Sequence, residues 1–289
     1  MIGSPVPTDI SSVQADSRPR SASAVRARID AHPVSGSPAE MRAAFSRLTG
    51  PAPALGREML GRVPAARVGT GPRRALWFHG GGYVFGAPET HAYAATHLAD
   101  EARATVWLPD YPLAPEAPWP AQIVTARAAL DAFPDPVALI GDSAGGHLAL
   151  RLALERPGQV ASLTLISPNT DRSGTAATRG SARDLMNDDA TDNALAHLAF
   201  GPRDGRKPEL SPWLDDLSVL PPTLILAASS EVLLDDSLLL ARAAAQAAAP
   251  VSLRIWPGLF HLWPLWPEAL PEAREALAAA AAHVAAHPG

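Results

Sequence analysis

Short apolar runs alternate with segments of helical spacing from residue 74 onward, and no other feature constrains the fold as strongly. We expect strands at 75–79, 105–109, 137–140, 162–166, 223–227 and 251–256. We expect helices at about 88–103, 120–133, 144–155, 235–248 and 268–286. The apolar runs lack polar alternation, as strands covered on both faces should. The sequence therefore predicts a mainly parallel sheet with helices on both faces.

Two parts of the chain fall outside this rhythm. Residues 1–22 are rich in Ser, Pro and Asp, which favours a loose arm; two short helices are expected within 23–48 and a hairpin around 57–70. Residues 169–220 contain no convincing strand but do contain a helix near 188–200. We call residues 169–220 the excursion. A segment of this length without strands inside a compact α/β domain is typical of a lid or binding element, and a surface loop is the alternative.

Composition narrows the classes of function. The chain of 289 residues has a net charge of −5, which gives no basic footprint for nucleic acid. It contains no cysteine, which excludes a disulfide framework, a thiolate metal site and a cysteine nucleophile. No uncharged stretch reaches the roughly 18 residues of a membrane span, and the N-terminus lacks a signal pattern. We expect a cytoplasmic protein without nucleic-acid or membrane partners.

The strongest chemical signal lies where the third apolar run meets the following helical segment. The sequence there contains Gly141-x-Ser143-x-Gly145. Between a strand and a helix, this pattern predicts a nucleophile elbow, in which a sharp turn leaves the serine Oγ exposed. The helix behind Ser143 favours negative charge near that oxygen. A plain Gly/Ser turn is the alternative, and we interpret Asp142 as a structural hydrogen-bonding partner.

A run of three glycines at 80–82 follows the strand expected at 75–79. Consecutive glycines let the backbone approach a ligand closely and turn its amides inward. Acyl transfer needs such preorganised N–H groups, because negative charge develops on the carbonyl oxygen. A flexible turn and a phosphate loop are the alternatives, but no lysine follows and the GxGxxG spacing of a phosphate loop is absent. We therefore predict an oxyanion hole formed by the backbone N–H groups of Gly81, Gly82 and Ala144.

A serine nucleophile needs a general base, and the base needs an acid that orients it. Of the nine histidines, His261 is the candidate, because it follows the strand expected at 251–256 and lies at the sheet edge where sites form. The acid should lie between serine and histidine in the chain. Glu231, the first acidic residue past the strand expected at 223–227, is our choice. Asp235 is second, and charge at a helix N-terminus is its alternative role.

Four motifs of the chain together carry a family resemblance. They are His79-Gly-Gly-Gly82, Asp110-Tyr-Pro-Leu-Ala-Pro-Glu116, Gly141-Asp-Ser-Ala-Gly-Gly146 and Ser211-Pro-Trp-Leu-Asp-Asp-Leu-Ser-Val-Leu-Pro-Pro222. Together they resemble the hormone-sensitive-lipase-like α/β-hydrolases, also called bacterial family IV esterases, over about residues 70–265. The resemblance implies an α/β-hydrolase fold with an eight-stranded, mostly parallel sheet. It also implies one domain over 1–289, with a helical cap formed by about 1–50 and 169–212.

The resemblance further implies a serine carboxylesterase that hydrolyses short- to medium-chain acyl esters through an acyl-enzyme, with no metal or cofactor. Its triad would be Ser143, His261 and Glu231. The family pattern places Asp at the head of a D-x-L-x-D motif, where this chain has Glu. Tyr111 and Glu116 match positions that brace the site. An amidase or deacetylase of an N-acyl small molecule is one alternative, and a catalytically silent small-molecule receptor is another.

Aromatic residues near these motifs are candidates for the substrate pocket. We expect Tyr83, Phe85, Trp213 and Phe260 to bind substrate, although each could equally be core packing. The expected partner is a small-molecule ester. Dimers are common in the family, so a homodimer is compatible with the resemblance.

Overall fold

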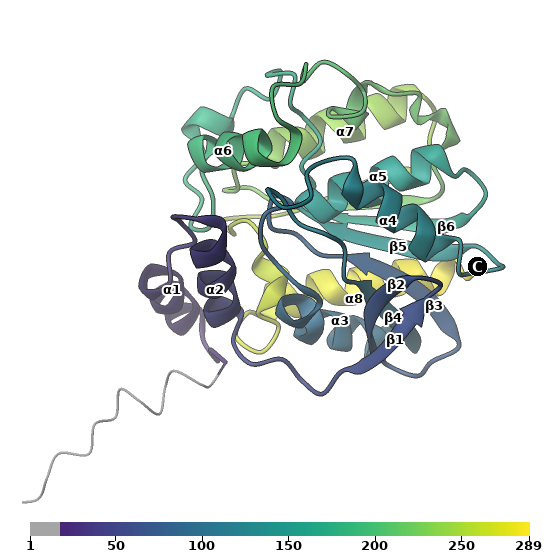
Figure 1. Cartoon of the computed structure of the whole chain (residues 1–289), viewed down its shortest axis with the longest axis horizontal. Coiled ribbons are helices and arrows are strands. Elements are labelled where there is room, and N and C mark those ends of the chain that lie inside the picture. Colours follow the sequence, from purple (N-terminus) through teal and green to yellow (C-terminus); the bar gives the residue numbers. More distant parts are fainter. Residues whose placement is uncertain (1–17) are drawn as a thin grey trace, which may run out of the picture.

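The alternating pattern folds as predicted into one sheet between two layers of helices (Figure 1). The computed structural model describes residues 18–289, with only the backbone for Ser181. The strands are β1 Gly56–Leu60, β2 Val63–Val68, β3 Arg73–Phe78, β4 Ala104–Pro109, β5 Val137–Asp142, β6 Val160–Ile166, β7 Thr223–Ala228 and β8 Val251–Trp256. Their order in the sheet is β1-β2-β4-β3-β5-β6-β7-β8. The predicted hairpin is the antiparallel pair β1–β2, and β2 also pairs antiparallel with β4, whereas every other pair is parallel.

Helices cover both faces of this sheet. They are α3 Pro88–Ala102, α4 Ala121–Leu130, α5 Ala144–Glu155, α7 Leu234–Gln246 and α8 Pro271–Ala286. The core beside α4, α5 and α7 is separate from the core beside α3 and α8. Every residue of β5 and β7 is buried, which explains why these runs show no polar alternation.

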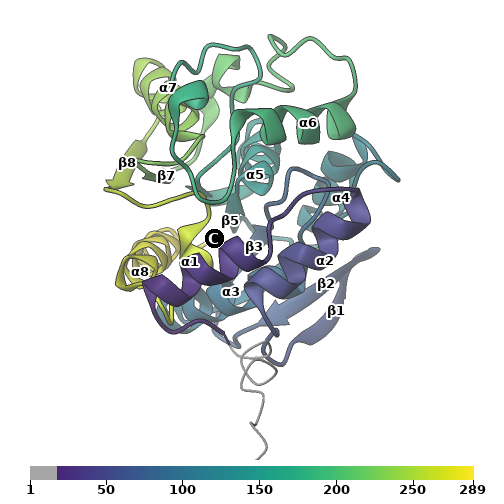
Figure 2. The ribbon, with the colours of Figure 1, turned by 90° about the vertical axis from the view of Figure 1, so that its left-hand side faces the viewer.

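The two N-terminal helices and the helix of the long excursion lie at one end of the molecule. They are α1 Ala22–Ala31, α2 Pro38–Thr49 and α6 Asp189–Phe200. Figures 1 and 2 show α6 in the upper part of this end and α1 and α2 in its lower part. No strand occurs in 169–220, as predicted. Residues 1–17, which form most of the predicted loose arm, lie outside the described residues.

Capping explains where α2 begins. The Ser37 side chain accepts from the Glu40 N–H, and the Glu40 carboxylate accepts from the Ser37 N–H, which together form a capping box. The buried face of α2 carries Phe45 and Leu48, which pack into the core shared with α3 and α8. The α6 helix instead packs through Leu195 and Phe200 against the core of the other face. The two groups of helices therefore pack mainly against opposite faces of the sheet, although Met41 of α2 joins the same core as α6.

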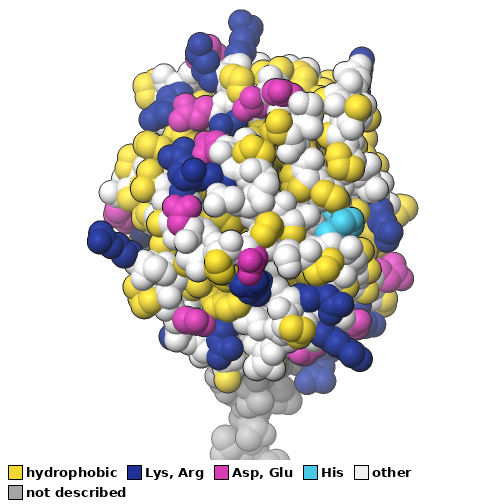
Figure 3. Space-filling view, turned by 90° about the vertical axis from the view of Figure 1, so that its right-hand side faces the viewer, with side chains coloured by type: hydrophobic (Ala, Val, Ile, Leu, Met, Phe, Trp, Pro, Cys, Tyr) yellow, Lys and Arg dark blue, Asp and Glu magenta, His cyan; other side chains and the backbone are white. Residues whose placement is uncertain are grey.

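The opposite end of the molecule carries charged side chains of both signs. There, Lys and Arg side chains are interspersed with Asp, Glu and apolar side chains (Figure 3). Within residues 18–289, no helix has the length and apolar character needed to cross a membrane.

Candidate active site

Ser143 lies at the turn between β5 and α5, in a strained backbone conformation. Its φ is 53° and its ψ is −120°, a region that non-glycine residues seldom adopt. A Cβ on Gly145 would lie 2.0 Å from the Phe78 carbonyl oxygen, and a Cβ on Gly141 would lie 2.2 Å from the Gly145 oxygen. Only glycine therefore fits at both flanking positions, and the structure forms the elbow that the sequence predicts.

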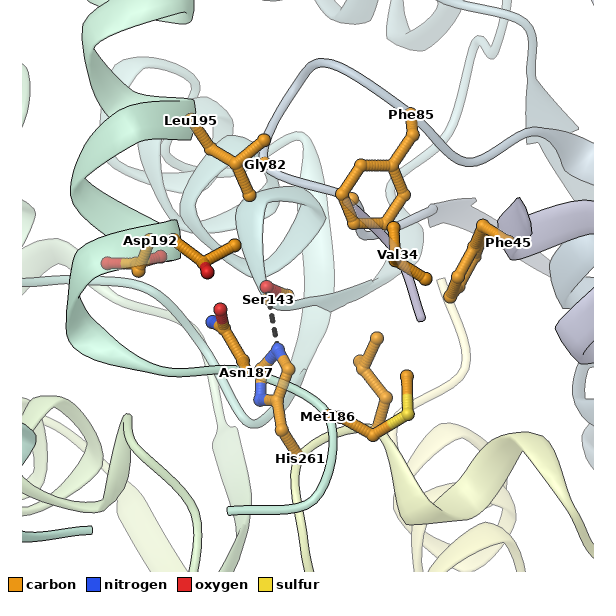
Figure 4. Close-up of a pocket in the computed structure, with 13 residues that line it drawn as sticks. Val34, Phe45, Gly82, Phe85, Ser143, Met186, Asn187, Asp192, Leu195 and His261 are labelled. Carbon is orange, nitrogen blue, oxygen red and sulfur yellow. Dashed lines mark hydrogen bonds between the residues drawn. The ribbon is translucent and has the colours of Figure 1, made fainter. Parts of the chain in front are cut away.

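His261 and Glu231 lie in line with Ser143. The Nε2 atom of His261 is 2.9 Å from the Ser143 Oγ (Figure 4). The Nδ1 atom of His261 is 3.3 Å from Oε2 of Glu231. Oε1 of Glu231 accepts a 3.0 Å hydrogen bond from the Ala228 N–H at the end of β7. The three side chains form one hydrogen-bonded row, and none of the three residues is more than 6% exposed.

The environment of His261 favours its charged form. Burial by itself lowers the pKa of His261. The hydrogen bond and charge of Glu231, together with the charges of Asp184 and Asp192, outweigh burial and raise this pKa above its ordinary value. The imidazolium that forms when His261 accepts a proton is therefore stabilised.

The second-choice acid has a different partner. Asp235 lies in the first turn of α7, where Oδ2 accepts a 2.8 Å hydrogen bond from the Thr178 N–H. The acid that the structure places beside His261 is thus Glu231.

The glycine run meets the serine from the side of β3. Gly81 and Gly82 have φ values of 115° and 59°, and a Cβ on Gly81 would lie 2.2 Å from the Phe85 carbonyl oxygen. Within residues 18–289, the N–H groups of Gly81 and Gly82 have no assigned acceptor. The Ala144 N–H belongs to the first residue of α5, where N–H groups have no partner within the helix. Three N–H groups are therefore available close to the Ser143 side chain.

A clamp from α2 supports the glycine run. Arg42 Nε donates to the Val84 carbonyl oxygen at 2.9 Å, and Nη2 donates to the Ala114 carbonyl oxygen at 2.9 Å. The same guanidinium binds both carboxylate oxygens of Glu116, at 2.8 and 2.6 Å. The hydrogen bond from Arg42 lowers the pKa of Glu116 to about 2. Sequence reasoning singled out Glu116 but missed Arg42, which lies 74 residues earlier.

Buried rings hold the start of the same loop. The Tyr111 ring stacks on His79, with centroids 4.2 Å apart, and its hydroxyl donates to the His79 carbonyl oxygen at 2.5 Å. Burial and nearby His91 lower the pKa of His79 to about 3, so it is neutral. Asp142 accepts from Trp77 Nε1 at 2.7 Å and lies 2.9 Å from His91 Nε2. These contacts agree with the interpretation of Asp142 as a structural hydrogen-bonding partner.

Two cavities meet at Gly82. The larger, of about 450 Å³, is lined by Ser143, His261 and the apolar side chains of Val34, Phe45, Phe85, Met186 and Leu195 (Figure 4). The smaller, of about 230 Å³, is lined by Gly82, Tyr83, Ala144, His147, Asn169, Arg172, Ala196 and Phe200. The larger cavity shares Val34, Met186, Asn187 and Thr191 with an open groove of about 950 Å³ between residues 29–35 and 184–191. The groove therefore adjoins the cavity that contains Ser143.

The predicted substrate-binding aromatics separate into two groups. Phe85 lines the larger cavity and Tyr83 the smaller one. Trp213 and Phe260 line neither of these cavities. Trp213 Nε1 donates to Asp171 Oδ1 at 3.0 Å, and Phe260 packs on Trp266 with ring centroids 5.7 Å apart. Both rings are occupied by packing, the alternative that the sequence left open.

Comparison with known proteins identifies the family to which this fold belongs. A family model described as alpha/beta hydrolase fold matches residues 75–265. An acetyl-hydrolase of Streptomyces hygroscopicus is 37% identical over 222 residues, which are 73% of this chain and 74% of the relative. An esterase of Acinetobacter venetianus is 34% identical over 213 residues, which are 69% of this chain and 70% of the relative.

Solved structures with a similar fold are likewise esterases and lipases. An esterase of the bacterial hormone-sensitive lipase family superposes with a TM-score of 0.84 at 28% identity, over 92% of this chain and 97% of that one. A hormone-sensitive lipase from a metagenome library gives a TM-score of 0.82 at 31% identity, over 91% and 95%. The chain therefore belongs to the α/β-hydrolase fold family, in its hormone-sensitive-lipase-like branch of carboxylic ester hydrolases.

Proposed function

We propose that the chain is a serine carboxylesterase that cleaves short- to medium-chain acyl esters through an acyl-enzyme. The observation that carries this proposal is the buried row of Ser143, His261 and Glu231 beside three available N–H groups. Family membership supports the reaction class, and the aromatic lining of the smaller cavity supports a limit on the length of the acyl chain.

The geometry suits two-step acyl transfer. His261 Nε2 takes the proton of Ser143 Oγ as this oxygen attacks the ester carbonyl, while Nδ1–H donates to Glu231. The N–H groups of Gly81, Gly82 and Ala144 donate to the oxyanion. His261 then gives its proton to the leaving alcohol, and a water molecule activated by His261 hydrolyses the acyl-enzyme. All charges that form are met by groups already in place.

The position of His261 decides which cavity holds which part of the substrate. His261 must reach the leaving oxygen to protonate it, so the alcohol lies in the larger cavity that His261 lines. The acyl chain then points away from His261, past Gly82 and Ala144 into the smaller cavity. Phe200 and Tyr83 line that cavity and should therefore limit the length of the acyl chain.

The proposed cap consists of about residues 1–50 and 169–212, and its described part contains helices α1, α2 and α6. Val34 and Phe45 reach the larger cavity from the N-terminal side, and Met186 and Leu195 reach it from the excursion. These side chains exclude water from the site, while the groove between the two segments leaves room for a larger alcohol.

Phe200→Ala should lengthen the acyl chain that the enzyme accepts. With p-nitrophenyl esters from acetate to dodecanoate, we expect the wild type to be most active on the short chains between acetate and butyrate. Removing the Phe200 ring should raise the hexanoate-to-acetate ratio of kcat/KM by about 10-fold, the effect of one or two methylenes in an apolar pocket. Phe133→Ala is the matched control, because Phe133 packs on Trp107 instead of lining either cavity.

Equal ratios in the Phe200 and Phe133 variants would place the acyl chain elsewhere. An anilide of matched acyl chain separates ester from amide hydrolysis. A folded protein that turns over none of these substrates would contradict the proposed function.

Arg42→Ala should weaken catalysis through the glycine run. Arg42 holds the Val84 carbonyl oxygen, and the Val84 N–H donates in turn to the Gly81 oxygen at 2.9 Å. We expect kcat for the butyrate ester to fall by about 10-fold with a smaller change in KM, because displaced oxyanion donors act mainly in the transition state. Arg47→Ala, an exposed arginine on the same helix, should leave kcat unchanged. Equal kcat values in both variants would show that the clamp does not support the site.

A further inference from the structure

One carboxylate from the excursion joins the loop after β7 to the loop after β8. Asp184 Oδ1 accepts a 3.0 Å hydrogen bond from the His261 N–H, and Oδ2 accepts a 3.0 Å hydrogen bond from the Val232 N–H. Val232 directly follows Glu231. Oδ1 also accepts from the Met186 N–H of its own loop at 3.0 Å. Asp184 thus contacts the backbone at both partners of the serine without touching the serine.

These contacts fix a distance that catalysis needs. Glu231 and His261 lie on different loops, and their side chains meet at 3.3 Å. The Val232 and His261 residues are at most 4% exposed, so their N–H groups would lack an acceptor if Asp184 were removed. The carboxylate therefore holds the two loops together from outside the core of the sheet.

Asp184 also contributes charge. Three acidic groups act on His261: Glu231 after β7, Asp184 before α6, and Asp192 within α6. The charge of Asp192 is compensated by ion pairs with Arg172 and Arg179. Within residues 18–289, no ion pair is assigned to Asp184. Its negative charge therefore favours the imidazolium form of His261.

The loop of Asp184 reaches the substrate as well. Met186 and Asn187 line the larger cavity (Figure 4). The segment that forms the cavity wall is thus the segment that holds the loops of Glu231 and His261.

We propose that Asp184 is a positioning residue that aligns Glu231 and His261 from the cap segment and couples their alignment to the placement of the cavity wall. This inference rests on the proposed esterase function. Asp184 acts through the backbone of its neighbours and does not contact the reacting atoms.

Asp184→Asn and Asp184→Glu separate alignment from charge. Asparagine offers one acceptor oxygen, and its amide group would face an N–H that Asp184 now binds. Its kcat for p-nitrophenyl butyrate should fall on the order of 10-fold, with little change in KM. The acid limb of kcat/KM should move to lower pH, because the imidazolium loses a neighbouring negative charge. Asp184→Glu keeps the charge, so the acid limb should stay at the wild-type pH. Its longer side chain displaces the carboxylate from the two N–H groups, so kcat should still fall.

Asp204→Asn is the matched control. Asp204 also lies in the excursion and accepts from a backbone N–H, that of Arg206 at 3.0 Å, but it is exposed and lines neither cavity. This variant should keep the wild-type kcat and acid limb. An acid limb at the wild-type pH in Asp184→Asn, with only a lower melting temperature, would overturn the inference and leave a structural role.

A readout without turnover distinguishes this inference from the proposed function. The titration of the His261 Cε1–H resonance, assigned by its absence in His261→Ala, should shift to lower pH in Asp184→Asn. Labelling of Ser143 by a fluorophosphonate reports the nucleophile directly. An unlabelled wild type would overturn the proposed function. A labelled wild type whose His261 titration and kcat are unchanged by Asp184→Asn would overturn the positioning role alone.

Discussion

Ser143→Ala should reduce kcat for p-nitrophenyl butyrate by about 10⁵- to 10⁶-fold, the loss expected when a serine nucleophile is removed. Alanine keeps the Cβ that Ser143 already has at φ 53°, so the elbow should fold unchanged. The N–H groups of Gly81, Gly82 and Ala144 remain, and they account for residual rate above the uncatalysed reaction. Long assays on highly purified variant measure the residual kcat. Circular dichroism checks that the variant is folded like the wild type.

Ser167→Ala is the matched control for this prediction. Ser167 is buried at the end of β6, has a φ of 46°, and its Oγ has no hydrogen-bond partner among the described residues. Its loss should leave kcat within a few-fold of the wild type. If Ser143→Ala kept more than about one hundredth of the wild-type kcat, the covalent route through Ser143 would be refuted.

The fold could be predicted because its signals are local. A buried parallel strand is an apolar run of four to eight residues, and its alternation with helices implies the sheet. The elbow around Ser143 is equally local, since the glycines that permit the turn are two residues away. The choice of His261 and Glu231 depends on two further rules: functional side chains gather at the carboxyl ends of parallel strands, and the acid lies between serine and histidine in the chain.

The remaining parts of the site depend on contacts that no local pattern encodes. Arg42 meets Glu116 across 74 residues, and Asp184 meets the His261 N–H across 77. A backbone N–H has no sequence signature, so an acid that binds one resembles any surface acid. For Trp213 and Phe260, the sequence does not choose between a pocket and the core. An aromatic ring beside a motif fits a core as well as a pocket, and only tertiary packing decides between them.

Glu231→Gln should lower kcat by about 10³- to 10⁴-fold, as when the acid of a catalytic triad becomes an amide. The Ala228 N–H would still find an acceptor in the amide oxygen. The amide NH₂ group would then face His261 Nδ1, which favours the tautomer with its proton on Nε2. That tautomer cannot accept the proton of Ser143. The loss is therefore in chemistry and should leave KM nearly unchanged.

The same substitution should also move the acid limb of the pH profile in a defined direction. Glu231 raises the pKa of His261 by its hydrogen bond and its charge, against the effect of burial. Only neutral His261 acts as a base, so the acid limb of kcat/KM follows this pKa and should move to lower pH in Glu231→Gln. Glu231→Asp keeps the charge and should hold the limb near its wild-type position. Asp235→Asn, whose carboxylate binds the Thr178 N–H, should change neither kcat nor the limb; a larger loss there than in Glu231→Gln would make Asp235 the acid.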